Sequence, residues 1–180
     1  MIVRPLIPLI GAALIVSLTA AITVPPREQR GRAGADCRAN ESGPAMRVTV
    51  TGLRDTRGSL RLELYPANDT EFLAPDRDLI ANGRVFRRVV ATPPASGTAS
   101  LCIRAPAAGT YALTVLHDRD RDGRFGFVSD GVGFSNNPRL SRAKPPASAV
   151  AIAIGSGVGS TRIVMNYRNG LTFTPLEHRR

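Results

Sequence analysis

Tryptophan is absent from this chain, and aromatic residues make up only 5% of its 180 residues. Leucine, isoleucine, valine and alanine must therefore fill the core, and the 43% hydrophobic content is ordinary for a globular protein. Aromatic side chains do not recur beside the arginines, so the chain lacks the stacking platform of proteins that bind single-stranded nucleic acid. We expect no nucleic-acid partner.

Long runs of basic residues are also missing, although the formal net charge is +10. Lys144 is the only lysine, and the arginines are scattered along the chain. A positive charge favours contact with acidic membrane surfaces or polysaccharides, but scattered arginines also keep an ordinary protein soluble. We favour the second interpretation.

Residue sets typical of enzymes and of zinc sites are absent as well. The histidines, His117 and His178, and the cysteines, Cys37 and Cys102, do not have the spacing of zinc ligands. The sequence contains no Walker loop and no G-x-S-x-G motif. His117 and Asp118 are neighbours on an expected strand, so their side chains point to opposite faces and cannot form a proton relay. These absences favour a protein without enzymatic activity.

Residues 1–23 predict an export segment, since Arg4 precedes an almost wholly apolar run over residues 6–22. The run is at the short limit for a membrane span, so the segment is either a cleaved signal peptide or an N-terminal membrane anchor. We expect a periplasmic or extracellular protein that contacts a membrane only through this segment, where it is retained. In an oxidising compartment, Cys37 and Cys102 favour one disulfide, worth ~4 kcal/mol in chain-entropy models of a long loop.

Alternation of apolar and polar residues dominates residues 46–167 and predicts β-strands. Residues 24–45 are rich in proline, glycine and charge and form an expected linker, and residues 168–180 form an expected flexible tail. About seven short strands with frequent turns predict an all-β fold, a single antiparallel β-sandwich. The inward-facing residues of the clearest strands are Met46, Val48 and Val50; Leu60, Leu62 and Leu64; Ala99, Leu101 and Ile103; and Tyr111, Leu113 and Val115.

Three carboxylates, Asp118, Asp120 and Asp122, alternate directly before Gly123 and match the first half of an EF-hand calcium loop. Alternate aspartates can converge on one hard cation if the backbone curls, and glycine permits that curl. The pattern predicts a Ca²⁺ site with the Arg124 carbonyl as a further ligand.

The sequence departs from the EF-hand motif further on. The twelfth position is Ser129 instead of the usual glutamate, and Asp130, the last of the expected ligands, comes one residue late. A metal-free turn rich in aspartate and glycine is the alternative. Asn136 and Asn137 could complete a metal shell or bind sugar hydroxyls, but we favour turn formation as their role. His117 is a further candidate binding residue, for which we favour a structural role at the strand end.

Five motifs follow one another in the same region. They are Val48–Leu53, Gly58–Tyr65, Pro106–Ala112, His117–Asp118 with its Asp/Gly loop, and Gly133–Pro138. In this order they resemble the bacterial family called domain of unknown function 2141, over about residues 46–167. Members are typically exported, and the family implies no catalytic residues. The Gly-Thr-Tyr start of one strand is also similar to prealbumin-like and carboxypeptidase-regulatory-like β-sandwiches, which are often binding modules.

Three functions follow from these observations. The first is an exported non-enzymatic β-sandwich that binds Ca²⁺, a carbohydrate or another cell-envelope partner. The second is a metal-dependent envelope hydrolase that uses Asp118, Asp120 and Asp122. The third is a purely structural envelope protein. The missing catalytic set favours the first, with Ca²⁺ as the expected cofactor.

Overall fold

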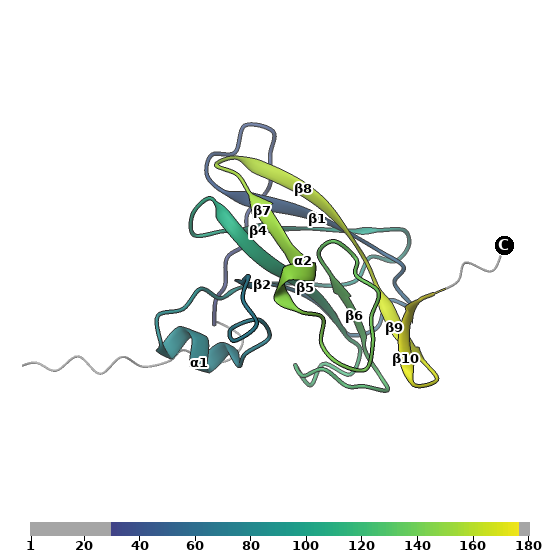
Figure 1. The fold of residues 1–180 in the computed structure, drawn as a ribbon. Coiled ribbons are helices and arrows are strands. Elements are labelled where there is room, and N and C mark those ends of the chain that lie inside the picture. Colours follow the sequence, from purple (N-terminus) through teal and green to yellow (C-terminus); the bar gives the residue numbers. More distant parts are fainter. Residues whose placement is uncertain (1–29, 177–180) are drawn as a thin grey trace, which may run out of the picture.

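The computed structural model describes residues 30–176 (Figure 1). The predicted export segment lies outside these residues. No helix within them is long and apolar enough to cross a membrane. The elements in chain order are β1 (Ala45–Thr51), β2 (Ser59–Pro66), α1 (Asp76–Ala81), β3 (Arg87–Ala91), β4 (Ala99–Arg104), β5 (Gly109–Asp118), β6 (Gly131–Phe134), α2 (Ala147–Val150), β7 (Ala151–Ile154), β8 (Val158–Val164), β9 (Asn166–Asn169) and β10 (Thr172–Pro175).

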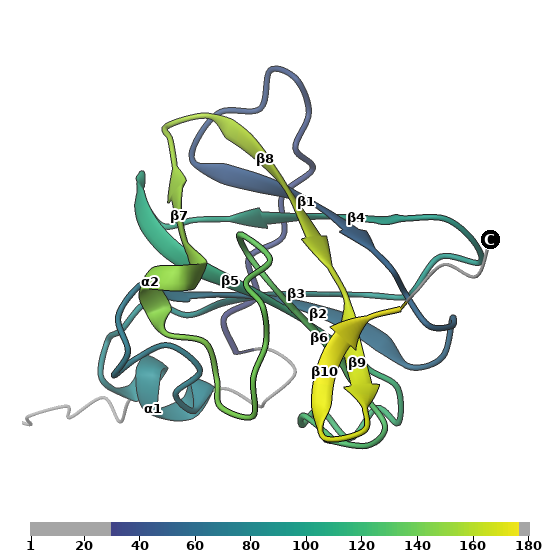
Figure 2. The same cartoon turned by 45° about the vertical axis from the view of Figure 1, so that its right-hand side comes forward.

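Two sheets lie face to face and confirm the predicted all-β sandwich (Figure 2). One sheet has the strand order β4-β1-β8. The other has the order β10-β9-β6-β5-β2-β3, with β7 paired to the beginning of β5. The pairs are antiparallel except for β1 and β8, which run parallel. The sandwich therefore differs in one pairing from the purely antiparallel one predicted.

The space between the sheets is filled by the alternating apolar residues of the sequence. Leu60, Leu62 and Leu64 of β2 are fully buried there, together with Val48 and Val50 of β1. Because successive side chains of a strand point to opposite faces, one apolar residue in two is enough to build this layer. Burial of each such side chain stabilises the fold by roughly 1.5–3 kcal/mol.

The opposite face of the seven-stranded sheet, here called the outer face, is covered as well. Tyr65 of β2 packs there edge-on against Phe72 and Phe86, with ring centroids 5.9 and 5.2 Å away. Phe72 also meets Phe134 of β6 at 6.0 Å. These rings form a second apolar cluster together with Leu79 of α1. The segment between β2 and β3 therefore folds over the sheet, and α1 lies beside it (Figures 1 and 2).

The described N-terminal segment ties the two sheets together. The Ala33 amide donates to the Arg88 carbonyl of β3, and the Ala33 carbonyl accepts from the Arg104 amide of β4. Cys37 is bonded to Cys102 of β4, with 5.8 Å between their Cα atoms, so the predicted cysteine pairing is supported.

Two apolar segments near the C-terminal end do not form single continuous strands. In residues 149–154, the first two residues end α2 and the other four pair as β7. Pro145 and Pro146 precede α2, and proline is well suited to the start of a helix. Met165 divides the chain between β8 and β9. Its amide donates to the Thr51 carbonyl, and the two strands belong to different sheets. β10, which pairs with β9, lies in the segment predicted as a tail.

Candidate metal and ligand site

The end of β5 places its last two side chains on different faces of the sheet. His117 pairs with Leu60 of β2 and faces the core, whereas Asp118 pairs with Ser59 and faces outward. Both side chains are buried, His117 at 0% and Asp118 at 2% exposure. The sequence argument that these neighbours cannot act as a relay agrees with this arrangement.

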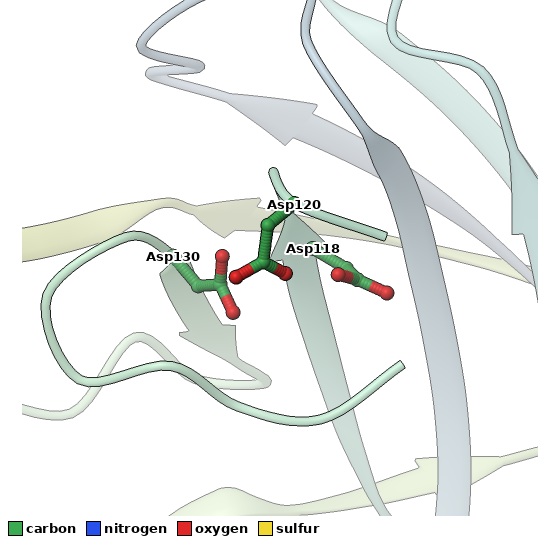
Figure 3. A group of neighbouring side chains, drawn as sticks. All are labelled: Asp118, Asp120 and Asp130. Atoms are coloured by element: carbon green, nitrogen blue, oxygen red, sulfur yellow. The ribbon is translucent and has the colours of Figure 1, made fainter. Parts of the chain in front are cut away.

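The acidic loop, residues 118–130, returns to the sheet at β6 and brings three carboxylates together. Asp118, Asp120 and Asp130 each offer an oxygen, and these oxygens lie within 4.8 Å of one another. Figure 3 shows the Asp120 carboxylate between the other two. We call these three residues the acidic cluster. Asp130 stands next to Gly131, which pairs with His117, so the β5–β6 ladder itself fixes both ends of the cluster.

Backbone amides of the loop hold each carboxylate of the acidic cluster. Asp118 Oδ2 accepts from the Gly123 amide at 3.0 Å, and Asp120 Oδ1 accepts from the Asp122 amide at 3.3 Å. The other two bonds reach Asp130, whose oxygens accept from the Arg119 and Gly126 amides at 3.0 and 2.7 Å. The loop is therefore built around its carboxylates.

Asp118 Oδ1 is the exception, because this buried oxygen accepts no hydrogen bond among the described residues. Burial raises the pKa of Asp118 above its usual value, and the neighbouring Asp130 and Asp120 raise it further. The Gly123 amide and the Arg61 guanidinium, 3.8 Å from Oδ2, act in the opposite direction without cancelling the rise. A buried oxygen without a donor and next to two carboxylates suits a bound cation.

Asp122 and Arg124, which the sequence pattern also assigned to the metal, are not part of the acidic cluster. Asp122 Oδ1 accepts from the Arg124 amide at 2.6 Å in a local turn. The arginines of the loop are also partly neutralised, since Arg119 forms a two-pronged ion pair with Asp55. This ion pair also lowers the pKa of Asp55. Arg121 donates to the Gly58 carbonyl at 3.3 Å and so braces the loop against the β1–β2 turn.

His117 forms a hydrogen-bond chain inside the core. Its Nε2 lies 2.8 Å from the Arg57 carbonyl, which can only accept, so Nε2 carries the proton. Its Nδ1 then accepts from the Tyr167 hydroxyl at 2.6 Å, and that hydroxyl accepts from the Arg54 amide at 3.0 Å. Burial lowers the pKa of His117 and raises that of Tyr167 to about 12. This arrangement favours the structural role over a binding role.

Asn136 and Asn137 use their amide groups on the protein backbone. Asn136 donates to the Ala151 carbonyl at 2.8 Å. Asn137 donates to the Arg162 carbonyl at 2.9 Å and accepts from the Val164 amide at 2.7 Å. Both have positive φ angles, 62° and 48°, which asparagine tolerates better than most residues. The turn interpretation accounts for all these contacts.

A cleft of about 690 Å³ opens on the outer face, next to the acidic loop. We call it the outer cleft. Its floor holds a chain of buried ion pairs along the sheet. Arg88 lies 2.7 Å from Glu63 and 3.0 Å from Asp76, and Arg30 lies 2.7 Å from Asp76. Arg61 lies 3.5 Å from Glu63 and reaches toward the acidic cluster.

Apolar side chains form the walls of the outer cleft. The acidic loop and β10 contribute three rings, with Phe173 5.6 Å from Phe125 and 5.2 Å from Phe127. Phe125 and Phe127 are about half exposed, at 49% and 45%. The remaining large apolar residues around the cleft are Leu73, Leu116, Val132, Phe134 and Leu140.

Sequence reasoning missed the outer cleft. Its floor residues Arg61 and Glu63 alternate with the core leucines of β2, and such a pattern ordinarily indicates a solvated face. One residue of the sequence did point to the cleft. Tyr65 lies on the same face of β2 as Arg61 and Glu63, and a large aromatic side chain there indicates that other residues cover this face. Arg88 and Asp76 carry no local signal, because only the fold brings them together.

The family comparison covers most of the sandwich. The sequence model of "Uncharacterized protein conserved in bacteria (DUF2141)" matches residues 48–162. The chain belongs to this family. This confirms the resemblance that the order of the motifs indicated. The matched region contains the acidic cluster and the β2, β3 and α1 residues of the cleft floor. The finer prealbumin-like assignment stays a prediction. Comparisons with the curated proteins and with the solved structures gave no match.

Proposed function

We propose that this DUF2141 protein is an exported, non-enzymatic binding module of the cell envelope, with a Ca²⁺ ion in its acidic loop. The observation that carries the proposal is the buried Asp118 carboxylate, whose Oδ1 accepts no hydrogen bond among the described residues and which lies beside two further carboxylates. Export is supported by the disulfide, because such bonds persist in oxidising compartments.

Calcium is the cation that these groups suit best. The acidic cluster supplies carboxylate oxygens only, and hard cations prefer oxygen ligands. Ca²⁺ accepts 6–8 oxygens in flexible geometry, so solvent and nearby carbonyls can complete a shell that three carboxylates begin. When bound, the ion supplies positive charge to a site where burial and like charges oppose ionisation of Asp118.

The hydrolase alternative has less support. It assigns the chemistry to Asp118, Asp120 and Asp122, yet the Asp122 carboxylate accepts from the Arg124 amide outside the acidic cluster. Each carboxylate of the cluster accepts a hydrogen bond from at least one loop amide, an arrangement suited to fixing a loop. The purely structural alternative leaves the outer cleft without a role, whereas a cleft of this size with a charged floor is typical of ligand sites.

The decisive experiment is thermal unfolding of the full disulfide-bonded chain with Ca²⁺ and with chelator. A Ca²⁺ concentration one hundred times the dissociation constant stabilises the folded state by about 2.7 kcal/mol. We expect Asp120→Ala to abolish this shift. Asp122→Ala is the matched variant, with the same charge change in the same loop, and it should retain the shift. No shift in the unmodified protein would refute the calcium site.

A further inference from the structure

We propose that the outer cleft binds a single-chain amphipathic anion, a carboxylate or phosphate head on an unbranched alkyl chain. This inference rests on the proposed binding function and assigns its ligand class, but it does not require the calcium site. It follows from the excess of cations over carboxylates in the lining of the cleft and from its apolar walls.

The side chains that line the outer cleft carry more positive than negative charge. Its carboxylates are Glu63 and Asp76, and its cations are Arg30, Arg61, Arg88, Arg124, Arg142 and Lys144. The arginines of the floor are themselves paired, with Glu63, with Asp76 and, at 3.8 Å from Arg61, with Asp118. Arg61 and Arg88 are 7% and 5% exposed, so their charges are screened little by solvent. Tyr65 donates its hydroxyl proton to Glu63 at 2.7 Å, which further occupies that carboxylate. An anion entering the cleft therefore meets a lining in which cations outnumber carboxylates.

Two of the cations that line the cleft form no ion pair within the described part of the chain. Arg124 of the acidic loop and Arg142 of the loop before α2 line the cleft, and neither forms an ion pair with a residue in the range 30–176. Lys144, also at the rim, is held by the Asp69 and Phe72 carbonyls at 3.0 and 2.9 Å. Guanidinium groups bind carboxylates and phosphates through paired hydrogen bonds. The rim thus offers a head-group site.

Because the walls of the cleft are apolar, we expect the ligand to carry an apolar group beside its anionic head group. Leu116 of β5 and Val132 of β6, which are paired across these two strands, line the cleft together with the rings of Phe125, Phe127 and Phe173. A bare inorganic anion would leave these walls in water, and a carbohydrate would set its hydroxyls against them without partners. The cleft volume of about 690 Å³ is within the usual range of small-molecule sites. An alkyl chain with an anionic end can pack against the apolar walls while its head group binds the arginines at the rim.

The test is titration calorimetry of the full chain with decanoate and decyl phosphate. Acetate, which lacks the chain, and decyltrimethylammonium, which reverses the charge, are the comparison ligands. Vesicles of anionic phospholipid form a separate arm, which distinguishes a free amphiphile from a lipid surface. We expect binding of decanoate or decyl phosphate at least about tenfold tighter than that of either comparison ligand.

Two variants place the binding in the outer cleft. Arg124→Ala combined with Arg142→Ala should weaken decanoate binding by at least about tenfold. The matched control is Arg77→Ala combined with Arg162→Ala, which removes the same charge from exposed positions outside the cleft. Val132→Trp, which fills the cleft from β6, should also abolish binding while the unfolding transition is retained.

The outcomes separate this inference from the calcium proposal. Decanoate binding that responds to the cleft variants supports the inference even if Ca²⁺ produces no thermal shift. A calcium shift without binding of either amphiphile overturns the inference alone. Binding to vesicles only, equal binding of decyltrimethylammonium, or equal losses in the two double variants would also overturn it.

Discussion

At the scale of single residues, Asp118 has opposite effects in the metal-free and metal-bound protein. Its raised pKa means that folding favours the neutral form of this carboxyl group. Asp118→Asn removes the charge and can still accept from the Gly123 amide. We expect the variant to be about 1 kcal/mol more stable than the unmodified protein in chelator, because an incompletely paired buried charge is removed. It should show no stabilisation by Ca²⁺.

Chemical denaturation with and without Ca²⁺ measures both effects of Asp118→Asn. The matched variant is Asp122→Asn in the same loop, whose carboxylate is exposed. It should change neither the stability in chelator nor the calcium response by a comparable amount. Loss of stability in Asp118→Asn with chelator present would show that the carboxylate is satisfied without a metal.

We expect His117 to lower the free energy of unfolding in mildly acidic solution. Burial lowers its pKa in the folded state, so the unfolded chain binds more protons at pH values between the folded pKa and about 6.5. The free energy of unfolding is therefore unaffected by this group above that range, and it falls as the pH decreases through it. One group contributes a slope of at most about 1.4 kcal/mol per pH unit.

Denaturation at a series of pH values in chelator tests the histidine contribution. His117→Gln keeps a donor for the Arg57 carbonyl but cannot be protonated, so its stability should fall less steeply between about pH 6.5 and 5. Tyr167→Phe serves as a control, since it breaks the same hydrogen-bond chain but retains the titrating group. Parallel pH profiles for His117→Gln and the unmodified protein would exclude His117 as the cause.

At the scale of structural elements, the turn before β2 supports the acidic loop. Gly58 has a φ of +75°, and a Cβ atom there would lie 1.9 Å from the Asp118 carbonyl oxygen. We expect Gly58→Ala to displace the first residues of the acidic loop and to reduce the calcium-dependent stabilisation. Gly83 has a similar φ of +65° but open space around it, so Gly83→Ala isolates the backbone strain of roughly 1–2 kcal/mol.

Comparison of the two alanine variants decides how much of the effect is steric. Gly58→Ala should lose at least about 1 kcal/mol more than Gly83→Ala in urea denaturation, because strain and overlap add in the first and strain acts alone in the second. Calcium stabilisation should fall in Gly58→Ala only. Equal losses of stability and an intact calcium response in both variants would argue against close packing of the turn on Asp118.

The same elements show what local sequence could predict. The period-two rows of β1 and β2 predicted the sandwich core because one face of each strand is wholly apolar. The spacing of the EF-hand motif correctly selected Asp118 and Asp120 as neighbours. The motif alone could not show whether Asp122 or Asp130 lies beside these two residues. Asp130 is brought there by the pairing of β5 with β6, and strand pairing is a property of the whole fold.

The outer cleft could not be predicted from the sequence, because it too depends on contacts between distant segments. Arg61 and Glu63 have the composition of a solvated strand face, and only the folding of Phe72 and Phe86 onto Tyr65 shows that this face is covered. Buried charge is costly unless it is paired. The aromatic residues that cover this face therefore require the ion pairs beneath them. Neither can be inferred from β2 alone.

At the scale of the whole molecule, the disulfide joins the N-terminal segment to β4 of the three-stranded sheet. Loss of it through Cys37→Ser with Cys102→Ser should lower the free energy of unfolding by about 2–5 kcal/mol, because the crosslink restricts the unfolded chain. The loss should also be visible locally. The Arg88 and Arg104 amides donate to the Gly31 and Ala33 carbonyls, so these amides should exchange hydrogen faster in the double variant.

Hydrogen exchange separates a local release from a global effect. If the disulfide chiefly holds the N-terminal segment, exchange at Arg88 and Arg104 should accelerate more than exchange at Leu62 and Val115, which lie in the centre of the seven-stranded sheet. Arg30, at the start of this segment, contributes to the cleft floor through Asp76, so release would also open one end of the outer cleft. Uniform acceleration across both sheets would mean that the crosslink acts through the unfolded chain alone.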